Sequence, residues 1–195
     1  MEQLKNEFKS IVNAKISRDG IEDLMQWLEG TDFFTAPAST RFHGSYEGGL
    51  VEHSLAVYKR MVQFADYYDQ EAHGKEGEHE WSEETLAIIA LFHDFCKIGT
   101  YKTELRWRKD AQQRWEQYPT YKKEEDFNFG GHGSKSMYLI QNFLSLEPQE
   151  AVAINCHMGK FDSTTYSNPS PAFEQFPLAW LLHVADEAAT YIDHK

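Results

Sequence analysis

Apolar residues recur every three or four positions through most of the chain, which is the spacing of helices that bury one face. This pattern predicts seven helices, over residues 1–16, 17–30, 50–69, 82–98, 129–146, 147–159 and 177–195. The glycine pair Gly48–Gly49 and the proline-bearing stretch 162–176 predict loops. We therefore expect a mainly α protein of about seven helices.

The period changes from helical to alternating in residues 100–123. Aromatic and charged residues alternate there on both sides of the polar stretch "KDAQQ", which is typical of two strands joined by a tight turn. A chain of 195 residues has the usual length of one domain. We expect a single domain over 1–195, with residues 1–40 as a helical lead-in and 100–123 as an inserted β-hairpin.

Composition and charge limit the possible partners. Hydrophobic residues make up 41% of the chain, charged residues 26%, and the net charge is −12. Proteins that hold long duplex nucleic acid usually present a basic surface, so we do not expect that partner. A small phosphorylated substrate is compatible with this charge, because bound cations change the local sign of the field.

The remaining general features of the sequence concern the cellular compartment of the protein. No apolar run reaches 18 residues, and the N-terminus lacks the apolar core of a secretory signal. Cys96 and Cys156 lie far apart in the sequence, as expected of free thiols in a reducing compartment. The sequence predicts a cytoplasmic protein without a membrane partner, and it leaves the oligomeric state open.

The strongest chemical signal is the apolar run "TLAIIALF", which leads directly into His93 and Asp94. An ionised carboxylate removed from water costs many kcal/mol unless something compensates it. Imidazole nitrogen and carboxylate oxygen are both metal ligands, so a metal ion would explain both residues. The hypothesis requires further ligands elsewhere in the chain.

Four other residues have the right chemistry and similar surroundings. They are His53, His132, His157 and Asp186, each within or at the end of another predicted helix. Any one of them alone is more often a buried polar residue that bonds to the backbone. Six such residues in five separate helical segments favour a shared metal site.

These residues and their neighbours resemble the HD superfamily of metal-dependent phosphohydrolases, which is named for a His–Asp doublet. The matching motifs are "HDFCKIG", "GGLVEH", "GHG", "HMG" and "LLHVAD", and the resemblance runs from about Arg41 to Ala189. The last four motifs are most similar to the HD domain of bacterial 3′-to-5′ exoribonucleases. The resemblance implies a compact helical HD-domain bundle with a two-metal site.

The resemblance also implies the role of each ligand. His53, His93, Asp94 and Asp186 would hold one divalent ion, and His132 and His157 would complete a second. Asp94 would bridge the two, as a carboxylate can at a separation of about 3.5–4 Å. Nitrogen and oxygen ligands suit Mn, Fe, Mg, Co, Ni or Zn. The implied reaction is hydrolysis of a nucleotide or short oligonucleotide by a metal-bridged hydroxide, with Asp94 and Lys97 as catalytic residues.

Several residues near these motifs are candidates for substrate contact. Lys97 could neutralise a phosphate or pair with a ligand carboxylate, and Lys135 shares a helix face with His132. Arg41 could clamp phosphate and His43 could line the pocket. For each of them a role as an ordinary surface residue stays open.

The predicted hairpin is a further candidate because it is locally basic. Residues 100–123 hold seven Lys and Arg against three Asp and Glu, a local charge of +4. Strand alternation puts Arg106 and Arg108 on one face and Trp107 on the other. We expect the arginine face to meet the substrate while Trp107 packs against the body, and an amphipathic hairpin with a purely structural role is the alternative.

Two other functions fit the same motifs. Some HD proteins hold two irons with the same ligand set and act as oxygenases. A non-catalytic nucleotide-binding HD module is the second alternative, and the complete set of six ligands argues against it. Iron content with oxygen uptake, or phosphodiester hydrolysis with Mn, would distinguish the first two.

Overall fold

The computed structural model describes residues 1–74, 80–124, 127, 130–161 and 168–193. In these residues it has eight α-helices and one two-stranded sheet, so the mainly helical prediction is confirmed. The α-helices are α1 (Glu2–Lys15), α2 (Ile21–Glu29), α3 (Gly49–Tyr68), α4 (Glu83–Phe92), α5 (His132–Gln141), α6 (Pro148–Cys156), α7 (Ser170–Gln175) and α8 (Pro177–Ala188). The short helical turns are η1 (Asp69–His73), η2 (Phe95–Lys97), η3 (Gly159–Phe161) and η4 (Ala189–Asp193).

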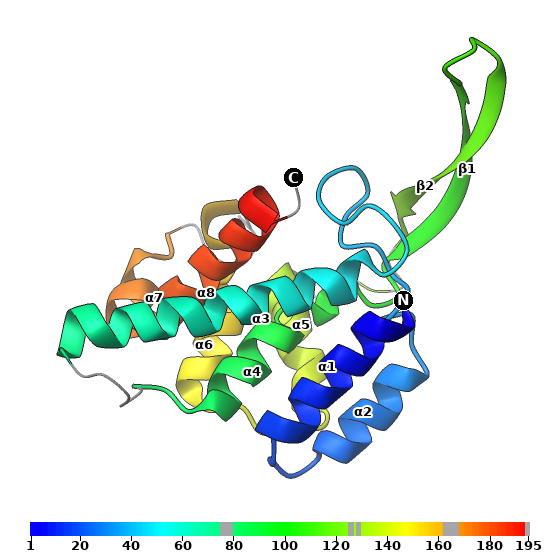
Figure 1. The fold of residues 1–195 in the computed structure, drawn as a ribbon. Helices are drawn as coiled ribbons and strands as arrows, with labels where there is room; N and C mark the ends of the chain where they lie inside the picture. Colours follow the sequence, from blue (N-terminus) through cyan, green and yellow to red (C-terminus); the bar gives the residue numbers. More distant parts are fainter. Residues whose placement is uncertain (75–79, 125–126, 128–129, 162–167, 194–195) are drawn as a thin grey trace.

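The long helix α3 organises the helical body. It packs against α4 and α8, while α6 packs against both α8 and α5 (Figure 1). Helices α1 and α2 lie beside one another at the end of the body that carries the N-terminus (Figure 1). The ligand-bearing segments predicted from the sequence therefore belong to helices that contact one another.

The core is apolar and rich in aromatic rings. Phe8 of α1, Phe33, Phe92 and Phe95 are completely buried. The ring of Phe33 lies 5.1 Å from that of Phe8 and 5.4 Å from that of Phe95, with tilted or edge-on geometry. Burial of such side chains stabilises the fold by about 1.5–3 kcal/mol each. The loop after α2 and the turn after α4 are thereby fixed to the same core.

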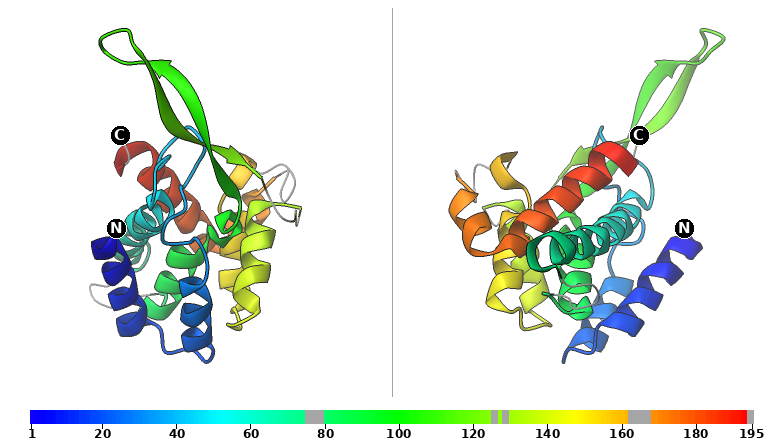
Figure 2. Two further views of the ribbon diagram at one scale, coloured as in Figure 1. Left: turned by 90° about the vertical axis from the view of Figure 1, so that its right-hand side faces the viewer. Right: turned by 60° about the vertical axis from the view of Figure 1, so that its left-hand side comes forward.

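The predicted hairpin is present as β1 (Tyr101–Lys109) and β2 (Trp115–Lys123), which pair antiparallel. It extends away from the helices in every view (Figures 1 and 2). Trp107 is 62% exposed. The prediction that Trp107 packs against the body is therefore wrong, because most of the hairpin has no body beside it.

The sequence prediction also missed two helix boundaries. Helix α7 lies in the stretch 162–176, which was predicted to be a loop. Its second residue is Pro171, and proline is tolerated in a first helical turn because the N–H it lacks has no intrahelical partner there. The helix predicted over 82–98 instead ends at Phe92 and continues as the turn η2.

Among the described residues, no helix combines the length and the apolar character needed to cross a bilayer.

Candidate metal centre

Helices α3 and α8 bring His53 and Asp186 together. His53 is completely buried in the first half of α3, and Asp186 is 8% exposed near the end of α8. His53 Nε2 lies 3.0 Å from Asp186 Oδ1. Gly49, the first residue of α3, leaves room for the preceding loop, since a Cβ there would lie only 2.0 Å from the carbonyl oxygen of Gly44. The loop that carries His43 can therefore approach α3 closely.

The end of α4 explains how neighbouring residues His93 and Asp94 reach one site. His93 is still helical, whereas Asp94 has φ −103° and ψ 22°, outside the α-helical region. On a regular helix the two side chains would point about 100° apart. The break after Phe92 turns Asp94 toward the side of His93, and both side chains are almost completely buried.

Helices α5 and α6 supply the other two histidines. His132 is the first residue of α5, and His157 follows the last residue of α6. The two helices are very close at Gly133, where a Cβ would lie 2.4 Å from the carbonyl oxygen of Asn155. A larger residue at position 133 would push apart the helix ends that carry the two histidines.

Asp94 lies at the centre of the cluster, and its two oxygens face different histidines. Oδ2 lies 3.5 Å from Nε2 of His93 and 3.7 Å from Nε2 of His53. Oδ1 lies 3.6 Å from Nε2 of His157. Two groups of side chains have ligand atoms within 4.8 Å of one another: His53, His93 and Asp186, and then His93, Asp94 and His157.

Backbone contacts fix the orientation of two of these rings. Nδ1 of His93 lies 2.8 Å from the carbonyl oxygen of Ala90, and Nδ1 of His157 lies 2.7 Å from that of Ile154. A carbonyl only accepts, so each Nδ1 carries a proton, and in the neutral ring this leaves Nε2 as the atom that can bind a metal. Both Nε2 atoms are buried, and neither has a hydrogen-bond partner among the described residues.

These features fit a metal ion. Buried polar atoms are normally satisfied, and an exception needs an explanation. A divalent cation among Nε2 lone pairs and carboxylate oxygens would satisfy His93, His157 and the two aspartates at once. The residues present are therefore able to hold metal.

The charge of Asp94 is balanced by Lys97, whose Nζ lies 2.5 Å from Asp94 Oδ2. Burial opposes ionisation of both groups, but their mutual attraction lowers the pKa of Asp94 and raises that of Lys97. Burial lowers the pKa of His93 to about 4, so this ring is neutral at neutral pH, as a metal ligand must be.

A pocket of about 450 Å³ opens onto this cluster. Four residues predicted from the sequence line it: His43, Lys97, His132 and Asp186. The ring of His43 lies 4.8 Å from that of His53, and burial is the largest cause that lowers the pKa of His43 to about 4. His132 thus shares the pocket with Asp186 but belongs to neither of the two close ligand groups.

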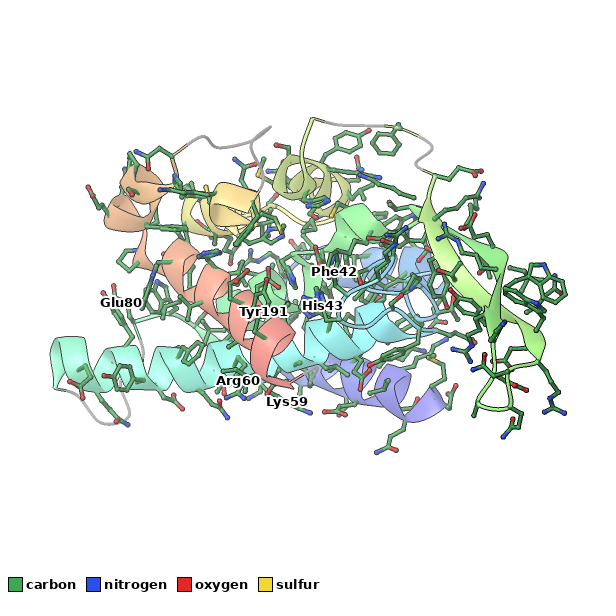
Figure 3. All side chains as sticks on the ribbon, turned by 90° about the horizontal axis from the view of Figure 1, so that it is seen from above. Phe42, His43, Lys59, Arg60, Glu80 and Tyr191 are labelled. Carbon is green, nitrogen blue, oxygen red and sulfur yellow. The ribbon has the colours of Figure 1, made fainter. Side chains whose placement is uncertain are left out.

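The pocket also has residues that the sequence did not reveal. Phe42, Phe161, Glu187 and Tyr191 line it. Figure 3 labels Phe42 and Tyr191, which lie on the same side of the body near His43. No motif distinguishes these residues from other aromatic or acidic positions, so their grouping depends on the fold alone.

Two predicted substrate residues lie outside the lining of this pocket. Arg41 is exposed next to Phe42. Lys135 is only 4% exposed, and its Nζ lies 3.4 Å from Thr100 Oγ1 and above the ring of Phe127. Lys135 therefore lies near the base of the hairpin, since Thr100 directly precedes β1.

The hairpin arginines are separated from the cluster. Nε of Arg106 bonds to Glu104 at 2.6 Å, and Nε of Arg108 bonds to Glu116 at 2.7 Å. A strand rises about 3.3 Å per residue, so Arg106, five residues after the first residue of β1, lies roughly 16 Å along the strand. Neither arginine lines the pocket.

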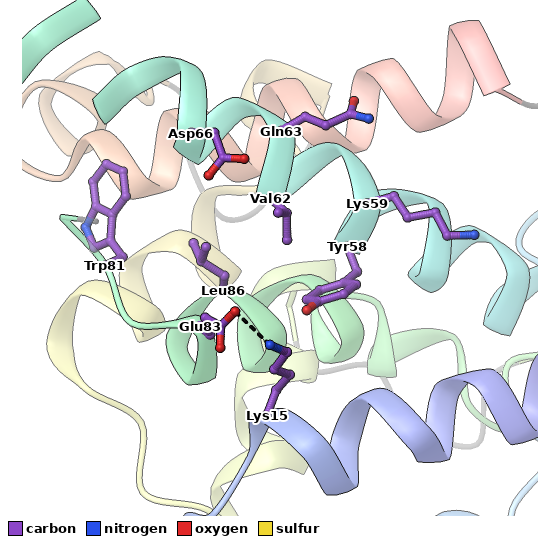
Figure 4. A pocket seen from close by; sticks show the side chains of 9 residues that line it. All are labelled: Lys15, Tyr58, Lys59, Val62, Gln63, Asp66, Trp81, Glu83 and Leu86. Carbon is purple, nitrogen blue, oxygen red and sulfur yellow. Dashed lines mark hydrogen bonds and ion pairs between the residues drawn. The ribbon is translucent and has the colours of Figure 1, made fainter. Parts of the chain in front are cut away.

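A second hollow of about 410 Å³ lies between α1, α3 and α4 (Figure 4). Its lining includes Tyr58, Trp81 and an ion pair between Lys15 and Glu83 at 2.7 Å. Neither of the two close ligand groups has a member there. The chemistry of metal binding therefore points to the first pocket.

Comparison with known proteins agrees with this geometry. Residues 50–191 match the family model for the HD domain. This chain belongs to the HD domain family. The family resemblance predicted from the sequence is thus confirmed, while the particular similarity to the exoribonuclease branch stays a prediction.

One similar protein is the dihydroneopterin 2′,3′-cyclic phosphate phosphodiesterase of Methanocaldococcus jannaschii. The two are 33% identical over 106 residues, which cover 51% of this chain and 39% of that protein. The HD-family chain thus spans about two fifths of that relative's length. No solved structure gives a significant match.

Proposed function

We propose that this HD-family protein is a metal-dependent phosphodiesterase that hydrolyses a small phosphate ester of nucleotide size. The proposal gives metal-binding roles to His53, His93, Asp94, His132, His157 and Asp186. Its reaction type is supported by the cyclic phosphodiester that the similar archaeal enzyme is named for. Its substrate size is supported by a pocket of about 450 Å³, within the usual range for small ligands.

The position of Asp94 carries the proposal. One carboxylate oxygen faces His53 and His93, and the other faces His157. This arrangement supports two ions with Asp94 between them, because a carboxylate spans the separation of two-metal sites. Bound divalent ions would supply a nucleophilic water and offset negative charge on the phosphoryl group. The ligand set suits Mn, Fe, Mg, Co, Ni or Zn.

Lys97 and His43 would complete the site from the protein side. Lys97 is charged at neutral pH, lines the pocket and lies beside Asp94, so it is placed to contact a phosphate oxygen. His43 is neutral at neutral pH and can donate or accept a hydrogen bond from the pocket wall. Arg41, exposed next to Phe42, would contact the phosphate only from the rim.

The test is metal content and turnover of the Mn-reconstituted protein. We expect close to two equivalents of metal per chain and hydrolysis of nucleoside 2′,3′-cyclic phosphates. Asp94→Asn should lower kcat/KM at least about 1,000-fold, which corresponds to about 4 kcal/mol. Asp110→Asn is the matched control, because Asp110 is a carboxylate in the hairpin turn, paired with Arg114 and outside the pocket lining.

Three outcomes would contradict the proposal. One is a single metal equivalent, and another is more than a few per cent activity in Asp94→Asn. The third is oxygen uptake by the iron-loaded protein without phosphate ester hydrolysis, which would favour the oxygenase instead. A short oligoribonucleotide in the same assay tests the similarity to exoribonucleases.

A further inference from the structure

Three exposed aromatic rings surround the mouth of the metal pocket. Phe42, Phe161 and Tyr191 are 81%, 68% and 59% exposed, and all three line the pocket. They come from the loop before α3, from η3 and from η4, segments far apart in the sequence. Apolar surface gathered around a pocket and left open to water is typical of a ligand-binding site.

A ligand with a flat aromatic ring suits such a rim. Stacking of a base on an aromatic side chain contributes about 1–3 kcal/mol. Tyr191 follows the metal-site residue Asp186 by five residues, which is roughly 6–8 Å along the helix axis. A ring at the rim and a phosphate at the metal centre could therefore belong to one nucleotide-sized molecule.

The pocket lining also includes a hydrogen-bond acceptor for the edge of that ring. Glu187 lines the pocket beside Asp186, but it belongs to neither close ligand group. A carboxylate accepts two parallel hydrogen bonds from adjacent N–H donors. The 2-amino-4-oxopyrimidine edge has such a pair of donors, and guanine and pterins both contain it. Adenine does not present this pair.

We propose that Phe42 and Tyr191 stack on a planar heterocycle whose 2-amino-4-oxopyrimidine edge donates to Glu187. The pocket would then select phosphate esters of guanine nucleosides or of pterins. The phosphate part rests on the proposed function, whereas the ring site rests on the pocket lining by itself.

The test measures ring binding without phosphate or metal. Saturation-transfer NMR titrations of the metal-free protein would use guanosine, neopterin, adenosine and methyl β-D-ribofuranoside. We expect guanosine or neopterin to bind at least fivefold more tightly than adenosine, and the ribofuranoside to show no saturation transfer. Comparison of guanosine with neopterin identifies the source of the ring.

Three variants and one control assign the contacts. Phe42→Ala and Tyr191→Ala should each weaken guanosine or neopterin binding about tenfold, as loss of one stacking partner predicts. Phe42→Trp keeps an aromatic ring at this position, so it should retain the binding that Phe42→Ala loses. Glu187→Gln should remove the preference over adenosine. Trp107→Ala is the control, because Trp107 is equally exposed but lies on the hairpin, outside the pocket.

Ribofuranoside binding as tight as guanosine binding would overturn the proposal, as would equal losses in Trp107→Ala and Phe42→Ala. Adenosine binding equal to that of guanosine in the unchanged protein would overturn it too. Failure of the phosphodiesterase proposal looks different: ring binding would persist, but the Mn-loaded protein would leave every cyclic phosphate intact.

Discussion

Two buried clusters of charged and polar side chains lie in different parts of the molecule, and only one of them is internally satisfied. The first joins Arg18, before α2, to Glu150 in α6. The second is the group around Asp94 at the end of α4. Both contain carboxylates almost completely removed from water, so burial alone does not distinguish them.

In the first cluster each charged group has several partners. The guanidinium of Arg18 donates to both oxygens of Glu150, at 2.5 and 3.0 Å, and to Glu84 at 3.3 Å. Glu150 also accepts from the hydroxyl of Thr85 at 2.9 Å and from the backbone N–H of Glu147 at 2.8 Å. Such a network holds the helices together without any further ligand.

In the second cluster two histidine ring nitrogens face inward and lack hydrogen-bond partners among the described residues. Nε2 of His93 and Nε2 of His157 lie 3.5 and 3.6 Å from the carboxylate oxygens of Asp94, and both are buried. Leaving a buried polar atom without a partner costs about 1–3 kcal/mol. The comparison indicates that unsatisfied polarity next to a pocket, rather than buried charge, distinguishes the candidate metal centre.

Breaking the first cluster should have the largest effect on stability. Arg18→Met leaves the carboxylate of Glu150 buried without its cation, so we expect a loss of about 3–5 kcal/mol in the free energy of unfolding. Urea denaturation followed by circular dichroism measures it. The double variant with Glu150→Gln should be less destabilised than the sum of the single variants, and strict additivity would show that the two side chains are not coupled.

Removing one proposed metal ligand from the second cluster should abolish activity but change stability only slightly. His93→Leu replaces a neutral, partly unsatisfied ring with an apolar side chain of similar size. We expect the free energy of unfolding of the metal-free protein to change by less than about 1.5 kcal/mol. Hydrolysis and binding of one of the two metal equivalents should both be lost. A destabilisation as large as that of Arg18→Met would mean that His93 has a structural role.

Bound metal should stabilise the folded protein only by binding at the second cluster. Ligand at 100 times its dissociation constant raises the free energy of unfolding by about 2.7 kcal/mol. Thermal unfolding with Mn, and again after chelation, should show a rise in Tm that His93→Leu reduces and Arg18→Met retains. An equal rise in Asp94→Asn would place the metal elsewhere.

The hairpin arginines should contribute least, both to the free energy of unfolding and to substrate binding. Arg106→Ala with Arg108→Ala removes exposed side chains whose ion pairs with Glu104 and Glu116 contribute about 0–1 kcal/mol each. We expect KM for a nucleoside cyclic phosphate to change less than about twofold, since these side chains lie outside the pocket. A tenfold rise in KM for the nucleotide, with a small chromogenic phosphodiester unaffected, would instead restore the role predicted from the sequence.

From the sequence alone one could predict the helical class and the hairpin, and name the residues that we propose to bind metal. Helical periodicity and strand alternation depend on residues close together in the sequence, so they can be recognised without knowledge of the tertiary contacts. His and Asp in apolar helices are conspicuous because burial of such groups needs compensation. The helix break after Phe92 escaped detection, since Phe95, Cys96 and Ile98 continue the apolar pattern beyond His93 and Asp94.

The tertiary structure was needed to show which basic and aromatic residues lie near the candidate metal centre. Arg106, Trp107 and Arg108 looked suited to a substrate, but the hairpin points away from the body (Figure 2). Phe42 and Tyr191 looked ordinary, yet they share a pocket with Asp186. Residues far apart in the chain meet only through helix packing, and local spacing contains no information about that packing.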